Sequence, residues 1–170
     1  MRKILEELPK LAKDKKQENI QYFKRLKKKP PKNLDSIMQK YHEDEFKNTD
    51  CLSCANCCKT TGPLFTNKDV DRIAKHLKIK SSQFEAQYLK KDEDGDFVLR
   101  ETPCAFLASD NYCLIYEVRP KACREYPHTN RKKFQQISNL TIQNVAICPA
   151  AFNIVERMKK NIPVGYKLKR

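Results

Sequence analysis

The sequence has little of what several large protein classes require. It contains no tryptophan and only three glycines in 170 residues. No apolar stretch approaches the roughly 18 residues of a membrane span, and the charged first residues do not resemble a secretory signal peptide. Three glycines can scarcely supply a phosphate-binding loop. These absences argue against membrane-spanning, collagen-like and signal-peptide-secreted proteins, and they lead us to expect a cytoplasmic location.

Acidic residues are also few relative to basic ones. The chain has 35 Lys and Arg against 21 Asp and Glu, a formal net charge of +14. The basic run Lys24–Lys32 could contact a phosphate backbone, although such runs are more often solvated helix faces. Nucleic acid is therefore not the partner we expect, and a nucleic-acid-binding zinc protein is the third of our functional hypotheses.

The first fifty residues predict two amphipathic helices without cysteine. Pro9 would start or kink the first helix, and Pro30–Pro31 separates it from the second. The apolar residues recur at roughly helical spacing: Leu8, Leu11, Ala12, Phe23 and Leu26, then Leu34, Ile37, Met38 and Tyr41. We expect residues 1–50 to form a helical arm that packs on the remainder and could dock a protein partner.

Residues 51–160 form the predicted cysteine-rich domain, followed by a basic tail over 161–170. Short elements are predicted here: helices capped by Thr66 with Asp69 and by Ser82 with Glu85, a turn at 92–96, strands at 97–99 and 113–116, and a last helix starting at Pro149. The expected fold class is mainly α with a small strand component, in which a metal organises an irregular domain.

Eight cysteines are the strongest signal in the sequence. They occur as Cys51-x2-Cys54-x2-Cys57-Cys58, followed by Cys104, Cys113, Cys123 and Cys148. Cysteines three apart on a tight loop can turn their sulfurs toward one centre, as in zinc and iron–sulfur sites. Adjacent Cys57 and Cys58 should project in different directions, so that one of them serves a second centre or a neighbouring ligand set. We predict all eight as metal ligands, enough for one or two centres.

Other uses of the cysteines fit less well. Four disulfides are unexpected in a chain without an export signal, since cytosolic thiols stay reduced. Buried unligated cysteines would explain an isolated Cys113 but not four within eight positions. Zinc and an iron–sulfur cluster both remain open. The Cys51/Cys54/Cys57 tripod and the lack of a second Cys-x2-Cys pair favour the iron–sulfur cluster slightly.

The order of these motifs resembles a known family. The cluster Cys51–Cys58, followed by Cys113-Leu-Ile-Tyr-Glu-Val-Arg-Pro-x2-Cys123-Arg-Glu-Tyr-Pro127, is similar to the YkgJ-type CxxCxxCC cysteine-cluster family. The resemblance covers about residues 51–155. It implies a zinc- or iron-chelating domain, chiefly bacterial, and it implies no particular reaction.

Residues near the cysteines could support a metal centre. Tyr116, Arg119 and Arg124 could donate hydrogen bonds to thiolates, and Arg124 is the strongest candidate. His128 is an alternative ligand, although a histidine in this position is more often a surface or core residue. His42 and His76 are expected to have ordinary surface roles.

Three functions are consistent with this pattern. The first is a metal-binding protein with a structural or redox role. The second is a metal-dependent enzyme acting on a protein side chain or a small molecule, and the third is the zinc protein that binds nucleic acid. Eight thiolates can saturate two centres, whereas a catalytic zinc keeps a position open for water. No catalytic residues are therefore predicted, and we favour the first hypothesis.

Overall fold

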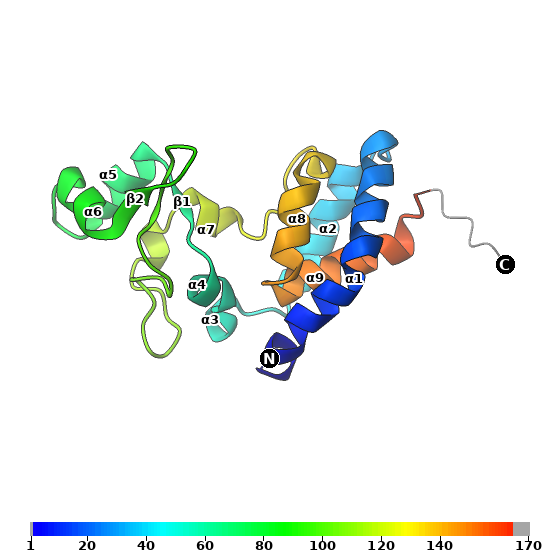
Figure 1. Ribbon diagram of the computed structural model, residues 1–170, viewed down its shortest axis with the longest axis horizontal. Coiled ribbons are helices and arrows are strands. Elements are labelled where there is room, and N and C mark those ends of the chain that lie inside the picture. The colour runs from blue at the N-terminus through cyan, green and yellow to red at the C-terminus, as the bar shows by residue number, and fades with distance from the viewer. Residues whose placement is uncertain (1, 165–170) are drawn as a thin grey trace. The chain divides into compact units, whose positions relative to one another are not determined.

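The computed structural model describes residues 2–164, which form two compact units (Figure 1). Within these residues, unit 1 contains 2–50 and 127–164, and unit 2 contains 51–126. Helices predominate, and unit 2 adds a small antiparallel sheet. The predicted fold class, mainly α with a small strand component, is confirmed. Residues 165–170, which make up most of the predicted basic tail, lie outside the described residues.

Unit 1 is a group of helices that pack side by side (Figure 1). A 3₁₀ turn, η2, precedes α8 in the second half of the chain. The elements are α1 (Arg2–Lys28), α2 (Leu34–Phe46), η2 (Phe134–Ile137), α8 (Ser138–Val145) and α9 (Pro149–Asn161). Both N-terminal helices are present as predicted, and α1 continues through Pro9 rather than starting there. Pro149 occupies the first turn of α9, as predicted.

The apolar stripes of these helices form one core. Leu8, Phe23 and Leu26 of α1 are almost fully buried, as is Met38 of α2. From α9, the core receives Ile154, Val155 and Met158, which lie on one face of the helix. The predicted helical spacing therefore identified the buried faces of α1 and α2.

Side-chain hydrogen bonds connect the two sequence segments of unit 1. The Asp35 carboxylate accepts from the backbone N–H groups of Lys133 (2.8 Å) and Phe134 (3.2 Å). Tyr22 donates its hydroxyl proton to the carbonyl of Ile162 at 2.8 Å, and burial raises the pKa of this phenol. These bonds give the C-terminal segment a defined register against α1 and α2.

Unit 2 is built from much shorter elements. Its helices and strands are α3 (Cys51–Cys54), α4 (Asn56–Thr60), β1 (Leu64–Phe65), α5 (Asn67–His76), α6 (Ser81–Tyr88), β2 (Leu89–Lys91), β3 (Phe97–Leu99), the 3₁₀ turn η1 (Tyr116–Val118) and α7 (Lys121–Glu125). The sheet has the order β1-β3-β2 and is antiparallel throughout. Strand β3 and the turn at 92–96 that leads into it match the prediction.

The two predicted helix caps had different outcomes. At α5, Thr66 Oγ1 accepts from the N–H of Asp69, and the Asp69 carboxylate accepts from the N–H of Thr66. At α6, the predicted cap of Ser82 with Glu85 is wrong. The helix begins at Ser81, and the N–H of Lys80 donates to the Gln83 side chain at 3.0 Å.

Aromatic rings dominate the core of unit 2. Phe84 is fully buried, and it stacks on Phe106 with ring centroids 6.0 Å apart. Tyr88 packs on both rings. Phe106 lies on the loop that connects Cys104 to Cys113, so this core fixes the loop that carries two cysteines.

The predicted strand at 113–116 is wrong. Only Cys113 pairs, in an isolated bridge with Leu107. The N–H of Tyr116 then donates to the carbonyl of Cys113, and Val118 donates to Ile115. These turn-like bonds wind the chain into η1, because they satisfy locally the groups that a strand would offer to a neighbour.

The structure groups the chain differently from the predicted limits 1–50, 51–160 and 161–170. Residues 127–164 pack with the N-terminal helices in unit 1, and only the boundary at 51 coincides with a unit boundary. The domain limits drawn from sequence therefore stay predictions. Among residues 2–164, no helix has the length and hydrophobicity needed to span a bilayer.

Candidate metal centre

The first cysteine group lies on two consecutive short helices. Cys51 and Cys54 are in α3, and Cys57 and Cys58 are in α4. Between them, Ala55 adopts a left-handed conformation with φ of 48° and is buried. This conformation is unfavourable for a residue with a Cβ, at a cost of about 1–2 kcal/mol. It separates α3 from α4, so the two cysteine pairs lie on different helices.

Cys104 and Cys113 lie on the two sides of a tight loop. The N–H of Cys104 donates to the carbonyl of Cys58 at 2.8 Å, which connects this loop to α4. In each case the backbone N–H two residues further on donates to the sulfur: Phe106 to Cys104, and Ile115 to Cys113. Backbone N–H groups aimed at sulfur stabilise a thiolate and favour metal ligation.

Cys123, in the one-turn helix α7, completes a group of four thiols. Each of these four thiols, Cys58, Cys104, Cys113 and Cys123, interacts electrostatically with the other three. All four sulfurs therefore lie in one region of unit 2. Burial raises the pKa of Cys104 to about 11 and that of Cys123 to about 12. It also raises the pKa of Cys113. Without a cation, these thiols keep their protons at neutral pH.

Cys58 differs from the other three. A hydrogen bond from the Cys57 thiol lowers the pKa of Cys58 to about 7, against the opposing effect of burial, and the charge of Lys59 acts in the same direction. The two adjacent side chains therefore contact each other, and the prediction that they diverge is wrong. Cys58 is the member of the group that most readily becomes a thiolate.

The remaining cysteine, Cys148, belongs to unit 1. Its sulfur accepts from the N–H of Ala151 at 3.4 Å and caps the first turn of α9. All eight cysteines are thiols rather than disulfides. Within the described residues, no three His, Cys, Asp or Glu side chains are close enough together to hold a metal ion. The thiols of unit 2 fit zinc or iron by their chemistry.

The predicted supporting residues occupy different positions around these thiols. The guanidinium of Arg119 lies 3.9 Å from the ring centroid of Tyr116, and its charge lowers the pKa values of Cys113 and Cys123 against the larger effect of burial. Arg124 donates to the carbonyl of Arg119 at 2.9 Å. Arg119 is therefore the arginine whose charge acts on Cys113 and Cys123, as Lys59 acts on Cys58, whereas the sequence favoured Arg124.

The histidines lie elsewhere in the chain. His128 belongs to unit 1 and has a left-handed backbone with φ of 65°. His42 Nδ1 is 2.8 Å from Thr129 Oγ1, and burial lowers its pKa. His76 is exposed in the last turn of α5.

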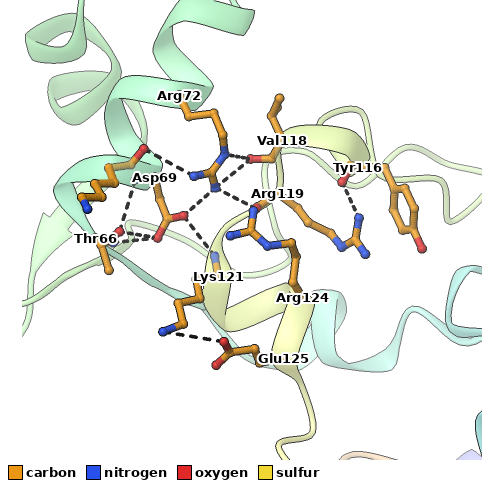
Figure 2. Close-up of polar contacts among 10 residues, drawn as sticks. Thr66, Asp69, Arg72, Tyr116, Val118, Arg119, Lys121, Arg124 and Glu125 are labelled. Atoms are coloured by element: carbon orange, nitrogen blue, oxygen red, sulfur yellow. Dashed lines mark hydrogen bonds and ion pairs between the residues drawn. The ribbon is translucent and has the colours of Figure 1, made fainter. Parts of the chain in front are cut away.

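The sequence reasoning missed a network beside Cys123. Asp69 and Arg72 of α5 bind the backbone that enters α7, as Figure 2 shows. Asp69 was expected only to cap its own helix. The available signal was an acidic cap residue followed by an arginine three positions later, a spacing that also occurs on solvated helix surfaces.

Comparison with known proteins gives one match. The family model CxxCxxCC, described as "Putative zinc- or iron-chelating domain", matches residues 50–141. No curated protein and no solved structure matches the chain significantly. The matched segment contains all the cysteines except Cys148, and it covers more than half of the 170 residues. The chain therefore belongs to the CxxCxxCC family of cysteine-rich domains.

Proposed function

We propose that unit 2 chelates zinc or iron through the thiolates of Cys58, Cys104, Cys113 and Cys123. The observation that carries this proposal is the match of residues 50–141 to a zinc- or iron-chelating family. The structure supports it, because the N–H of Cys104 donates to the carbonyl of Cys58 at 2.8 Å and the four thiols, from separate segments of the chain, are near enough to interact. Four thiolates are a complete ligand set for a tetrahedral zinc or for an iron–sulfur cluster. The role that follows is structural or electron-transferring, in a reducing bacterial cytoplasm.

Two further features support ligation by this set. The N–H groups of Phe106 and Ile115 already point at the sulfurs of Cys104 and Cys113, and Arg119 supplies positive charge beside Cys113 and Cys123. A divalent cation with four thiolates carries a net charge of about −2, which such donors and cations stabilise.

Metal uptake in this site is coupled to local structure. The thiols have to lose their protons when they bind a metal, and burial holds the protons on Cys104, Cys113 and Cys123. One metal held by this set connects α4, the loop between Cys104 and Cys113, and α7. Affinity rises with pH, since fewer protons must then be displaced.

The four proposed ligands suit either metal, since four thiolates can hold zinc or an iron–sulfur cluster. The preference for an iron–sulfur cluster rests on the Cys51/Cys54/Cys57 spacing, which lies outside this ligand set. Zinc would supply a fixed tetrahedral link, and a cluster would supply one-electron chemistry. Ligation by Cys51, Cys54, Cys57 and Cys148 stays a prediction from the sequence.

Metal and sulfide analysis after anaerobic purification tests the proposal. The wild-type protein should retain at least one equivalent of metal. If it binds an iron–sulfur cluster, the protein should be brown and contain acid-labile sulfide. Cys104→Ser and Cys123→Ser should each lose metal from the unit 2 centre. Ala105→Ser is the matched control, because it places the same side chain one residue away at an exposed position. Equal metal content in all four proteins would overturn the proposal.

A further inference from the structure

Two side chains of α5 hold the backbone that leads into α7 (Figure 2). The Arg72 guanidinium donates to the carbonyls of Val118 (3.3 Å) and Arg119 (3.0 Å). It also pairs with the Asp69 carboxylate. The same Asp69 oxygen accepts from the N–H of Lys121, the first residue of α7, at 3.1 Å. One ion pair, with its carboxylate buried and its guanidinium partly exposed, thus binds three consecutive peptide groups of the backbone.

The geometry requires these residue types. A guanidinium offers several donors spread over three nitrogens in a fixed plane, so Arg72 can reach two carbonyls and a carboxylate at once. The three donors of a lysine ammonium all radiate from one nitrogen and do not match this arrangement. The Asp69 side chain is only 2% exposed, and its second oxygen accepts from both the N–H and the hydroxyl of Thr66. Both oxygens of the Asp69 carboxylate are therefore hydrogen-bonded, and these bonds fix the position of the side chain.

The backbone held in this way lies between two proposed ligands, Cys113 and Cys123. Helix α7 is a single turn, with too few internal hydrogen bonds to hold its own orientation. The side chain of Arg119 leaves the same segment to stack on Tyr116, and it donates to the Tyr116 carbonyl at 2.6 Å. Arg124 adds a second guanidinium to the Arg119 carbonyl. The orientation of both Cys123 and Arg119 thus depends on contacts made outside α7.

We propose that Asp69 and Arg72 are positioning residues for the thiolate centre, holding Val118–Lys121 so that Cys123 and the Arg119 guanidinium face the other three thiols. This inference rests on the proposed function. It adds that α5, a helix without any cysteine, sets the geometry and affinity of the centre.

The test compares Arg72→Lys with Arg100→Lys, a matched exchange at an exposed arginine of the same unit. Zinc affinity is measured by chelator competition, and the Co²⁺-substituted proteins give an absorption spectrum that reports thiolate geometry. Arg72→Lys should bind zinc about 10–100-fold more weakly, the usual effect of losing an outer hydrogen-bond partner. Its cobalt spectrum should also change. Arg100→Lys should match wild type in both measurements.

Asp69→Asn is the second variant, because its amide oxygen can still accept from Lys121 while the ion pair is lost. It should also weaken zinc binding, and hydrogen exchange should show α5 and α6 still protected. If both variants had the zinc affinity and cobalt spectrum of the wild-type protein, the positioning role would be overturned, while the proposed function would stand. Loss of protection across α5 and α6 in both would assign a general folding role and overturn it too. Absence of metal binding by wild type would overturn the proposed function itself, and the inference with it.

Discussion

The two units hold their shape by different means. Unit 1 buries the apolar faces of long helices, with α1 alone spanning 27 residues. In the cysteine-bearing half of unit 2, the helices α3, α4 and α7 have only four or five residues each. Backbone groups there are bound by side chains such as Asp69 and Arg72. The cysteines of unit 2 are partly buried, except for Cys51, which is exposed. Apolar burial thus suffices for one unit, whereas the other has the character of a domain completed by a ligand.

Removal of the metal should produce the largest difference in stability between the two units. Structural metal binding contributes about 10 kcal/mol or more to folding in model peptides. A chelator under reducing conditions should therefore abolish amide protection in α3, α4 and α7, while α1, α2 and α9 stay protected. Residue-resolved hydrogen exchange measures both in one sample. Unchanged protection in unit 2 after complete metal loss would show that the two units do not differ in this way.

Core truncations sharpen the same comparison. Phe23→Ala in unit 1 and Phe84→Ala in unit 2 each remove an almost fully buried ring, at an expected cost of about 3–5 kcal/mol. Each should lower protection in its own unit first, and only Phe84→Ala should lower zinc affinity, because Phe84 stacks on Phe106 beside Cys104. Tyr112→Ala, at a half-exposed ring, is the control. If Phe23→Ala weakened zinc binding as much, the units would not be energetically separate.

Lowering the pH should destabilise unit 2 by protonating Asp69, and this effect should be smaller than that of the core truncations. Burial raises the pKa of Asp69, but hydrogen bonds from Thr66 and Arg72 outweigh it and hold the pKa below its ordinary value. The stability from this carboxylate is thus fully present above the unfolded pKa of about 3.9 and is lost as the pH falls through the lower folded value. Asp69→Asn should cost about 1–3 kcal/mol at neutral pH. The difference from wild type should shrink in acid, and a constant difference in urea titrations would contradict this role.

Much of the fold could be predicted from local patterns. Helical spacing identified the buried faces of α1 and α2, and Pro149 and the Thr66–Asp69 pair gave correct helix starts. The strand expected at 113–116 failed because its apolar residues fill a turn, where the bonding of Tyr116 to Cys113 is local. A short apolar segment has the same sequence pattern whether it forms a strand or a turn.

The candidate site was less predictable from the sequence. The spacing of the first cysteine group identifies a family of metal-chelating domains, but it does not show which sulfurs share a region. That grouping depends on contacts between distant residues, such as the bond from Cys104 to Cys58. The role of Arg72 was equally hidden, since its partners are backbone carbonyls 46 and 47 residues away and carry no side-chain signature.

The division of unit 1 into two sequence segments has a consequence for synthesis on the ribosome. Unit 2 is continuous and can fold as soon as it has emerged, whereas α1 and α2 must wait for α9. About 100 residues separate the end of α2 from the start of α9, which takes about 5–20 seconds at translation rates of about 5–20 residues per second. During that interval the apolar stripe of α1 is exposed and available to chaperones, so the cysteine-rich unit is finished before the helices that flank it in sequence.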